Sequence, residues 1–178
     1  MVKVNGFTLV EFLVLLIIIN ILALAAAPSF GDIFADNKLA LQHNRLLSAI
    51  SLTRSEAIKR GQRVTLCQST DSISCSKDSV GWNEGWVSYV DSNTNNQIDS
   101  DEPILLVQQQ TAENIGISFG TRTRIAFHSN GQAVGGSNGT FLLCDHRGDA
   151  AKQGLIISIT GRVRKAQTSD LDSKACPP

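Results

Sequence analysis

Two arginines near the C-terminal end of the sequence have the type and spacing needed to bind phosphate groups. Arg162 and Arg164 alternate in the run Gly161-Arg162-Val163-Arg164-Lys165. On a β-strand their side chains would therefore project from the same face. Guanidinium groups placed in this way hold successive phosphates through charge-assisted hydrogen bonds. The predicted patch is completed by Lys165 and by the weaker candidates Arg147, Lys152 and Lys174. The alternative interpretation is a solvated edge strand whose basic side chains discourage pairing with another sheet.

A second group of polar residues has the spacing of a calcium-binding loop. Oxygen-bearing side chains occupy the first, third, fifth, ninth and twelfth positions of an EF-hand-like segment. These residues are Asp91, Asn93, Asn95, Asp99 and Glu102. Asn96 stands where the loop usually has glycine, and strand-like rather than helical segments flank it, so calcium is only a weak candidate. The alternative is a polar hairpin connection rich in turn formers. We expect no other metal and no cofactor.

The remaining polar residues do not form a recognisable catalytic set. The histidines are His43, His128 and His146, and His146 follows Asp145 without a Gly-x-Ser-x-Gly nucleophile motif. The run Gly135-Gly136-Ser137-Asn138-Gly139 lacks the Gly-Lys-Ser/Thr ending of a phosphate-binding P-loop. Basic and acidic residues number 16 each, so composition alone predicts no affinity for polyanions. The sequence therefore predicts a protein that is not an enzyme.

The elements that position these groups begin with a long apolar stretch, Gly6–Phe30. It contains Glu11 near its start, and Asn20 is its one strongly polar side chain between Phe12 and Ala27. A helix through Phe7–Pro28 would be about 30 Å long, enough to cross the hydrocarbon core of a bilayer. A carboxylate within such a segment is costly and indicates a functional role.

A cleaved secretory signal is the main alternative for this stretch. Lys3 provides a basic start, and Ala25-Ala26-Ala27 provides a small-residue cleavage site. Pro28 directly after that site and Glu11 near the start both disfavour this interpretation.

The order Gly6-Phe7-Thr8-Leu9-Val10-Glu11 resembles the processing site of type IV prepilins and type II secretion pseudopilins. The resemblance implies that a prepilin peptidase cuts between Gly6 and Phe7 and methylates the new amine of Phe7. It also implies that Glu11 meets the N-terminal amine of a neighbouring subunit during filament assembly. An apolar environment tolerates a carboxylate when a buried cation pairs with it.

The rest of the sequence predicts the second half of a helix and then a β-rich head. Apolar residues between Phe30 and Ile58 recur near helical spacing and Gly61 is the expected stop, so one helix, bent near Pro28, should run from about Phe7 to Arg60. Strand-like runs between turn residues are Val64–Gln68, Trp86–Val90, Ile104–Gln109, Ile115–Phe119, Arg124–Phe127, Phe141–Asp145, Leu155–Ile159 and Arg162–Lys165. A long helix followed by an antiparallel sheet predicts the α+β class.

These elements divide the chain into four expected segments. They are a leader at 1–6, a transmembrane or filament-core helix at 7–28, an amphipathic helix at 29–61 and a β-rich globular head at 62–178.

Several short runs in the head resemble the pseudopilin H and FimT-type minor pilin group. They are Gly81–Trp86, Phe127 with Gly131, Leu143-Cys144-Asp145 and Gly161-Arg162-Val163-Arg164. In FimT-type minor pilins a Gly-Arg-x-Arg element binds DNA during natural transformation. The resemblance implies that Arg162, Arg164 and Lys165 bind the backbone of double-stranded DNA without sequence specificity.

The cysteines fall into two sequence groups, Cys67 with Cys75 and Cys144 with Cys176. An even number of cysteines in an exported domain favours disulfides, and no pair has the spacing of a zinc site. We expect Cys67–Cys75 and Cys144–Cys176, although three pairings are possible in principle.

These observations together predict a minor type IV pilin that binds extracellular double-stranded DNA. It should be held by one span in the bacterial inner membrane with its head in the periplasm, and later be displayed on a pilus at the cell surface. Its expected partners are other pilins or pseudopilins through the N-terminal helix, prepilin peptidase, the membrane and DNA. The main alternative is a pseudopilin H of a type II secretion system. A third possibility is an adhesive or assembly-related minor pilin that does not bind DNA.

Overall fold

The computed structural model describes residues 6, 8–76, 78, 80–110 and 114–176. Its first element is the helix α1, Leu9–Arg60, which is 52 residues long. The chain divides into two compact units, Met1–Asn37 and Lys38–Pro178, so α1 contributes its first part to one unit and its second part to the other.

In the first unit, α1 begins with a reciprocal cap between Thr8 and Glu11. The Glu11 carboxylate accepts hydrogen bonds from the Thr8 backbone N–H at 2.9 Å and from the Thr8 hydroxyl at 3.0 Å. The Glu11 N–H donates to the Thr8 hydroxyl oxygen at 3.3 Å. This arrangement is a capping box, which satisfies donors that the first turn of a helix leaves without partners.

The apolar side chains of this part of α1 are exposed from Leu9 to Leu22. The side chain of Asn20 donates to the Leu16 carbonyl at 2.7 Å, so the helix backbone itself satisfies this polar group. Over the part of the chain that the structure describes, no helix has both the length and the apolar character required to cross a membrane.

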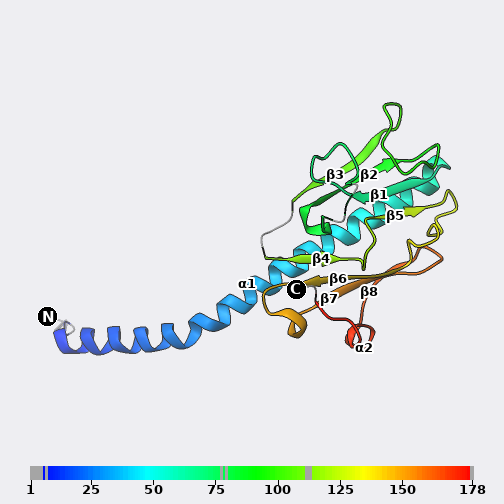
Figure 1. The fold of residues 1–178 in the computed structure, drawn as a ribbon. Coiled ribbons are helices and arrows are strands. Elements are labelled where there is room, and N and C mark those ends of the chain that lie inside the picture. Colours follow the sequence, from blue (N-terminus) through cyan, green and yellow to red (C-terminus); the bar gives the residue numbers. More distant parts are fainter. Residues whose placement is uncertain (1–5, 7, 77, 79, 111–113, 177–178) are drawn as a thin grey trace. The chain divides into compact units, whose positions relative to one another are not determined.

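In the second unit the head contains two four-stranded antiparallel sheets, which confirms the predicted α+β class (Figure 1). The first sheet has the order β3-β2-β1-β5, and the second has the order β4-β6-β7-β8. The strands are β1 (Val64–Gln68), β2 (Gly85–Val90), β3 (Ile104–Gln109), β4 (Gly116–Ser118), β5 (Arg124–Phe127), β6 (Gly139–Cys144), β7 (Gln153–Ile157) and β8 (Val163–Lys165). The bounds of β1, β3 and β5 match the predicted runs, whereas β7 lies two residues earlier than predicted and β8 begins after Arg162.

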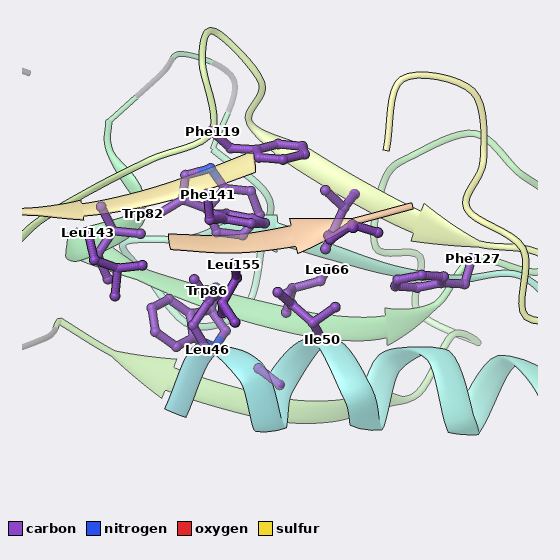
Figure 2. Packing of buried hydrophobic residues seen from close by; sticks show 14 of the residues in the cluster. Leu46, Ile50, Leu66, Trp82, Trp86, Phe119, Phe127, Phe141, Leu143 and Leu155 are labelled. Atoms are coloured by element: carbon purple, nitrogen blue, oxygen red, sulfur yellow. The ribbon is translucent and has the colours of Figure 1, made fainter. Parts of the chain in front are cut away.

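Apolar side chains from α1 and from both sheets form one core. Leu46 and Ile50 of α1 pack with Leu66 of β1, Trp86 of β2 and Phe141 of β6 (Figure 2). The ring of Phe141 stacks on Phe119 with a centroid distance of 4.2 Å, and it meets Trp82 edge-on at 4.9 Å. Burial of aromatic rings of this size is a large stabilising contribution, so this core holds both sheets on α1.

The C-terminal segment is fixed by a disulfide and by a short helix. Cys144 at the end of β6 bonds to Cys176, and Cys67 of β1 bonds to Cys75, so both expected pairs are present. After β8 the chain forms α2, Thr168–Leu171, in a segment for which the sequence predicts neither a helix nor a strand. Leu171 is buried against Leu142 and Ala166, which anchors the helix to the second sheet.

Candidate nucleic-acid interface

The predicted phosphate-binding residues lie at one edge of the second sheet. In this sheet β8 is an edge strand that pairs with β7, with Ile156 opposite Arg164 and Leu155 opposite Lys165. Side chains alternate along a strand, so Arg164 and Lys165 project from opposite faces. Leu155 is a core residue, which places Lys165 on the core-facing side of the sheet, although its side chain is exposed.

A second observation agrees with this orientation of Lys165. The buried imidazole of His43, on α1, has a lowered pKa, chiefly because of its burial and to a smaller extent because of the charge of Lys165. Lys165 therefore lies toward the helix, and it does not belong to the face that carries Arg164.

Arg162 precedes β8 and lies in the turn that joins it to β7. The backbone pairing nevertheless continues to this residue, because the Ser158 N–H donates to the Arg162 carbonyl at 2.9 Å. Arg162 is opposite Ser158 and Arg164 is opposite Ile156, so alternation places both arginines on the same face. Within the described residues no hydrogen bond or ion pair engages the exposed guanidinium of Arg162.

The turn that carries Arg162 is pressed against a neighbouring loop. Gly161 has φ +78°, and a Cβ at this position would collide with the carbonyl of Gly131. That carbonyl accepts a hydrogen bond from Nε of Arg54 on α1 at 2.9 Å. The Ala133 N–H also donates to the Ile159 carbonyl at 3.0 Å. Glycine is required here because it tolerates both the positive φ and the close approach, and the contacts hold the backbone of Arg162 in place.

Arg164 forms an ion pair that the sequence does not predict. Its Nη1 lies 2.7 Å from Oδ2 of Asp170 and its Nη2 lies 3.2 Å from Oδ1, so the carboxylate is bound by both ends of the guanidinium. Asp170 also caps α2 by accepting the Gln167 N–H at 2.8 Å. These bonds, led by the one from Arg164, lower the pKa of Asp170 to about 2.

Two of the weaker candidates, Arg147 and Lys152, are also engaged by neighbouring groups. Nη2 of Arg147 lies 2.7 Å from Oδ2 of Asp145, and the hydrogen bonds from Arg147 lower the pKa of that carboxyl. Nζ of Lys152 donates to the Lys174 carbonyl at 2.6 Å and lies 3.6 Å from Oδ1 of Asp149.

In the calcium-like loop the carboxylates are bound by protein donors. Asp99 accepts hydrogen bonds from the side-chain amides of Asn93 and Asn95, each at 2.7 Å. Glu102 accepts the N–H and the hydroxyl of Ser92 at 2.7 and 3.0 Å. Asp91 is buried and lies 3.2 Å from Nε of Arg63, in an ion pair without hydrogen-bond geometry. No group of three or more acidic, histidine or cysteine side chains suited to a metal ion is found among the described residues.

The predicted processing site lies at the edge of the described residues. Gly6 is exposed and Glu11 belongs to the capping box of α1, whereas Phe7 lies outside the described residues. The sequence reasoning did not recognise that Thr8 and Glu11 have the Thr-x-x-Glu spacing of a capping box, although this signal is visible in the sequence.

A long helix packed on antiparallel sheets, with a disulfide-tethered C-terminal segment, defines a pilin-like protein. A family model described as "Type II transport protein GspH" matches residues 42–161, and the chain therefore belongs to the GspH family. The matched residues end at Gly161, so Arg162, Arg164 and Lys165 lie beyond them.

Two solved structures illustrate this fold. The type IV minor pilin FimU of Pseudomonas aeruginosa is similar with a TM-score of 0.55 and 19% identity, over 75% of this chain and 91% of that chain. The minor pseudopilin EpsH of the Vibrio cholerae type 2 secretion system is similar with a TM-score of 0.50 and 11% identity, over 72% of this chain and 96% of that chain. No curated protein matches the chain in sequence.

Proposed function

We propose that this chain is a minor pilin whose head binds the backbone of double-stranded DNA during natural transformation. The observation that supports this proposal is the exposed guanidinium of Arg162, which has no partner among the described residues and lies on a turn whose backbone packs against the Gly131 loop. Because the backbone of this turn is already fixed, contact with a phosphate orders only the Arg162 side chain, and less conformational entropy is lost than on a mobile turn. Arg164 would be a second contact on the same face, provided that Asp170 releases it.

DNA binding by this edge should be dominated by phosphates and should fall steeply with salt. Arg147, Lys152 and Lys174 would contribute less, because neighbouring carboxylates or carbonyls engage Arg147 and Lys152. Lys165 would contribute to the local field rather than to the face that carries Arg162. Each phosphate contact adds about 0.9 to the slope of log affinity against log salt concentration.

The N-terminal segment would serve assembly. Cleavage between Gly6 and Phe7 by prepilin peptidase would create a methylated amine, and Glu11 would pair with the amine of a neighbouring subunit. The exposed apolar side chains from Leu9 to Leu22 support burial of this segment, first in the inner membrane and then among helices in the filament core. The head would face the periplasm before assembly and the cell exterior afterwards.

The DNA proposal is tested by fluorescence anisotropy with a labelled duplex, using the full-length protein in non-ionic detergent micelles. Arg162→Gln combined with Arg164→Gln should remove most of the binding. The slope of log affinity against log salt concentration should fall by up to about 1.8, the value for two phosphate contacts. Lys59→Gln with Arg60→Gln is the matched control, because it removes the same charge from the exposed end of α1. Equal loss of affinity in both double variants, each folded by circular dichroism, would refute a specific interface.

The alternative function is a structural pseudopilin of a type II secretion system. It is favoured by the description of the matching family and by the similarity to EpsH. This function requires assembly but no DNA binding. A deletion strain that loses protein secretion, together with a full-length protein that does not bind duplex DNA at low salt, would favour it over the minor pilin.

A further inference from the structure

Three arginines from two distant segments of the sequence line one pocket on the head. The pocket has a volume of about 310 Å³ and lies between the start of β5 and the loop after it. Arg63 reaches it from the segment before β1, and Arg122 and Arg124 reach it from the start of β5. None of these residues belongs to the candidate DNA interface.

The arginines are held in place mainly by neutral oxygen atoms. Arg122 Nη1 donates to the Asn138 carbonyl at 3.1 Å, and its guanidinium lies over the Phe119 ring at 5.0 Å from the centroid. Arg124 Nη1 donates to the Asn96 carbonyl at 3.1 Å. These bonds fix the two side chains without neutralising their charge.

Only Arg63 has a carboxylate partner among the described residues. It forms the ion pair with Asp91, and its Nη2 also donates to the side-chain oxygen of Asn96. Asn96 therefore orients two of the arginines, Arg63 through its side chain and Arg124 through its carbonyl. Since Asp91 pairs with Arg63 and the partners of Arg122 and Arg124 are neutral carbonyls, the lining of the pocket retains an excess of positive charge.

Three residues of the loop after β5 also line the pocket. Gly135, Gly136 and Ser137 line the pocket, and Gly136 has φ +84° with open space where a Cβ would lie. Within the described part of the chain, the N–H groups of Gly135 and Gly136 donate no hydrogen bond, whereas the Ser137 N–H donates to the Val134 carbonyl at 2.8 Å. The buried Ser137 hydroxyl accepts the Ala126 N–H at 2.9 Å, which fixes this loop to β5.

We propose that this pocket binds a phosphate group. Two guanidinium groups without a carboxylate partner among the described residues, together with the backbone N–H groups of Gly135 and Gly136 in the same lining, supply several donors, which suits a tetrahedral oxyanion. Arginine remains charged at every physiological pH, so the site can bind phosphate without any change in the protonation of its arginines. The volume accommodates a phosphate with part of the molecule that carries it.

This site is independent of the proposed DNA interface. It uses different residues and a different sheet, because β5 belongs to the first sheet and β8 to the second. Binding at this pocket would therefore survive the loss of Arg162, and DNA binding at the β8 edge would survive the loss of Arg122.

The test is isothermal titration of the full-length protein in non-ionic detergent micelles with inorganic phosphate, at ionic strength balanced with chloride. Arg122→Gln should weaken phosphate binding about tenfold, as expected for the loss of one charge-assisted contact. Arg60→Gln is the matched control, because it removes one arginine charge from the exposed end of α1, outside the pocket, and it should leave the affinity unchanged. Absence of phosphate binding by the wild type, or an equal effect of the two substitutions, would overturn the proposal.

Two further arms identify the source of the phosphate. Glycerol phosphate is a phosphate monoester, dimethyl phosphate is a diester, and acetate is the control anion. The ester that binds with the higher affinity, relative to acetate, identifies the class of ligand. Acetate binding as tightly as all the phosphates would overturn the assignment. Arg124→Gln provides a second variant, and circular dichroism reports whether each variant is folded.

Discussion

The ion pair between Arg164 and Asp170 leads to a prediction that tests the candidate DNA interface directly. Asp170→Asn should increase the affinity for duplex DNA. The asparagine side chain retains an oxygen that can accept the Gln167 N–H, so the cap of α2 is kept. A neutral amide holds a guanidinium more weakly than a carboxylate does. The substitution therefore frees Arg164, which lies on the same face as Arg162, to contact a phosphate.

The magnitude follows from the number of phosphate contacts. One additional contact should steepen the slope of log affinity against log salt concentration by about 0.9. Between about 50 mM and about 200 mM salt, this slope corresponds to an additional loss of about 3.5-fold in affinity. The gain should therefore be largest at low salt and should diminish as salt is added.

Asp172→Asn provides the matched control. Asp172 is exposed next to α2, and within the described residues no ion pair joins it to Arg164. Both substitutions remove one negative charge from the same segment, but only Asp170→Asn releases a guanidinium. Anisotropy titrations of the full-length variants across salt concentrations provide the measurement. If both variants have the same salt slope as the wild type, Arg164 does not reach a phosphate and the reasoning is wrong.

Four further results are expected. Gly161→Ala should lower the melting temperature followed by circular dichroism, because its methyl group would collide with a backbone carbonyl; an unchanged melting temperature would contradict this reading of the turn. Phe141→Ala should cost about 3–5 kcal/mol in urea unfolding, since its ring is fully buried, and a cost below about 1 kcal/mol would argue against the observed core. Replacing Cys144 and Cys176 by serine should cost about 3–4 kcal/mol, the loop-closure value for a separation of 32 residues, and identical stability under reducing and oxidising conditions would exclude this contribution. The stabilising contribution of ionised Asp170 should be present above pH 3.8 and be lost as pH falls toward 2, because its pKa is lowered from 3.8 to about 2. If the difference in melting temperature between wild type and Asp170→Asn is the same at every pH in this range, the prediction is wrong.

The sequence predicts the helix and most strands because their signals are local. The bounds of β1, β3 and β5 follow from short apolar runs between turn residues. Helix α2 has only four residues, too few for a periodic pattern, and the sequence therefore predicts no helix there. The sequence predicts that Arg162 begins a strand, whereas β8 begins at Val163. The turn before β8 packs against a distant loop, and this contact cannot be seen in the sequence.

The partners of the basic residues depend on contacts between distant segments. Arg164 meets Asp170 only because α2 turns the chain back toward β8. The arginine pocket depends on the pairing of β1 with β5, whose register places Arg63 and Arg124 on the same face of the first sheet, and on the loop residue Asn96, which accepts hydrogen bonds from both. Sequence patterns report which side chains could bind an anion, whereas pairing of strands decides which of them remain unneutralised.

The bond between Cys144 and Cys176 makes the geometry of the basic edge depend on the redox environment. It closes the segment that contains β8, α2 and the partner of Arg164 into a single covalent loop. Where thiols remain reduced, the end of this segment is held only by noncovalent contacts, such as the burial of Leu171 and the hydrogen bond from Cys176 to Asp149. Formation of this disulfide therefore completes the basic edge. In protein that folds in a reducing compartment, the same basic side chains would be present, but the segment that carries them would be less firmly held.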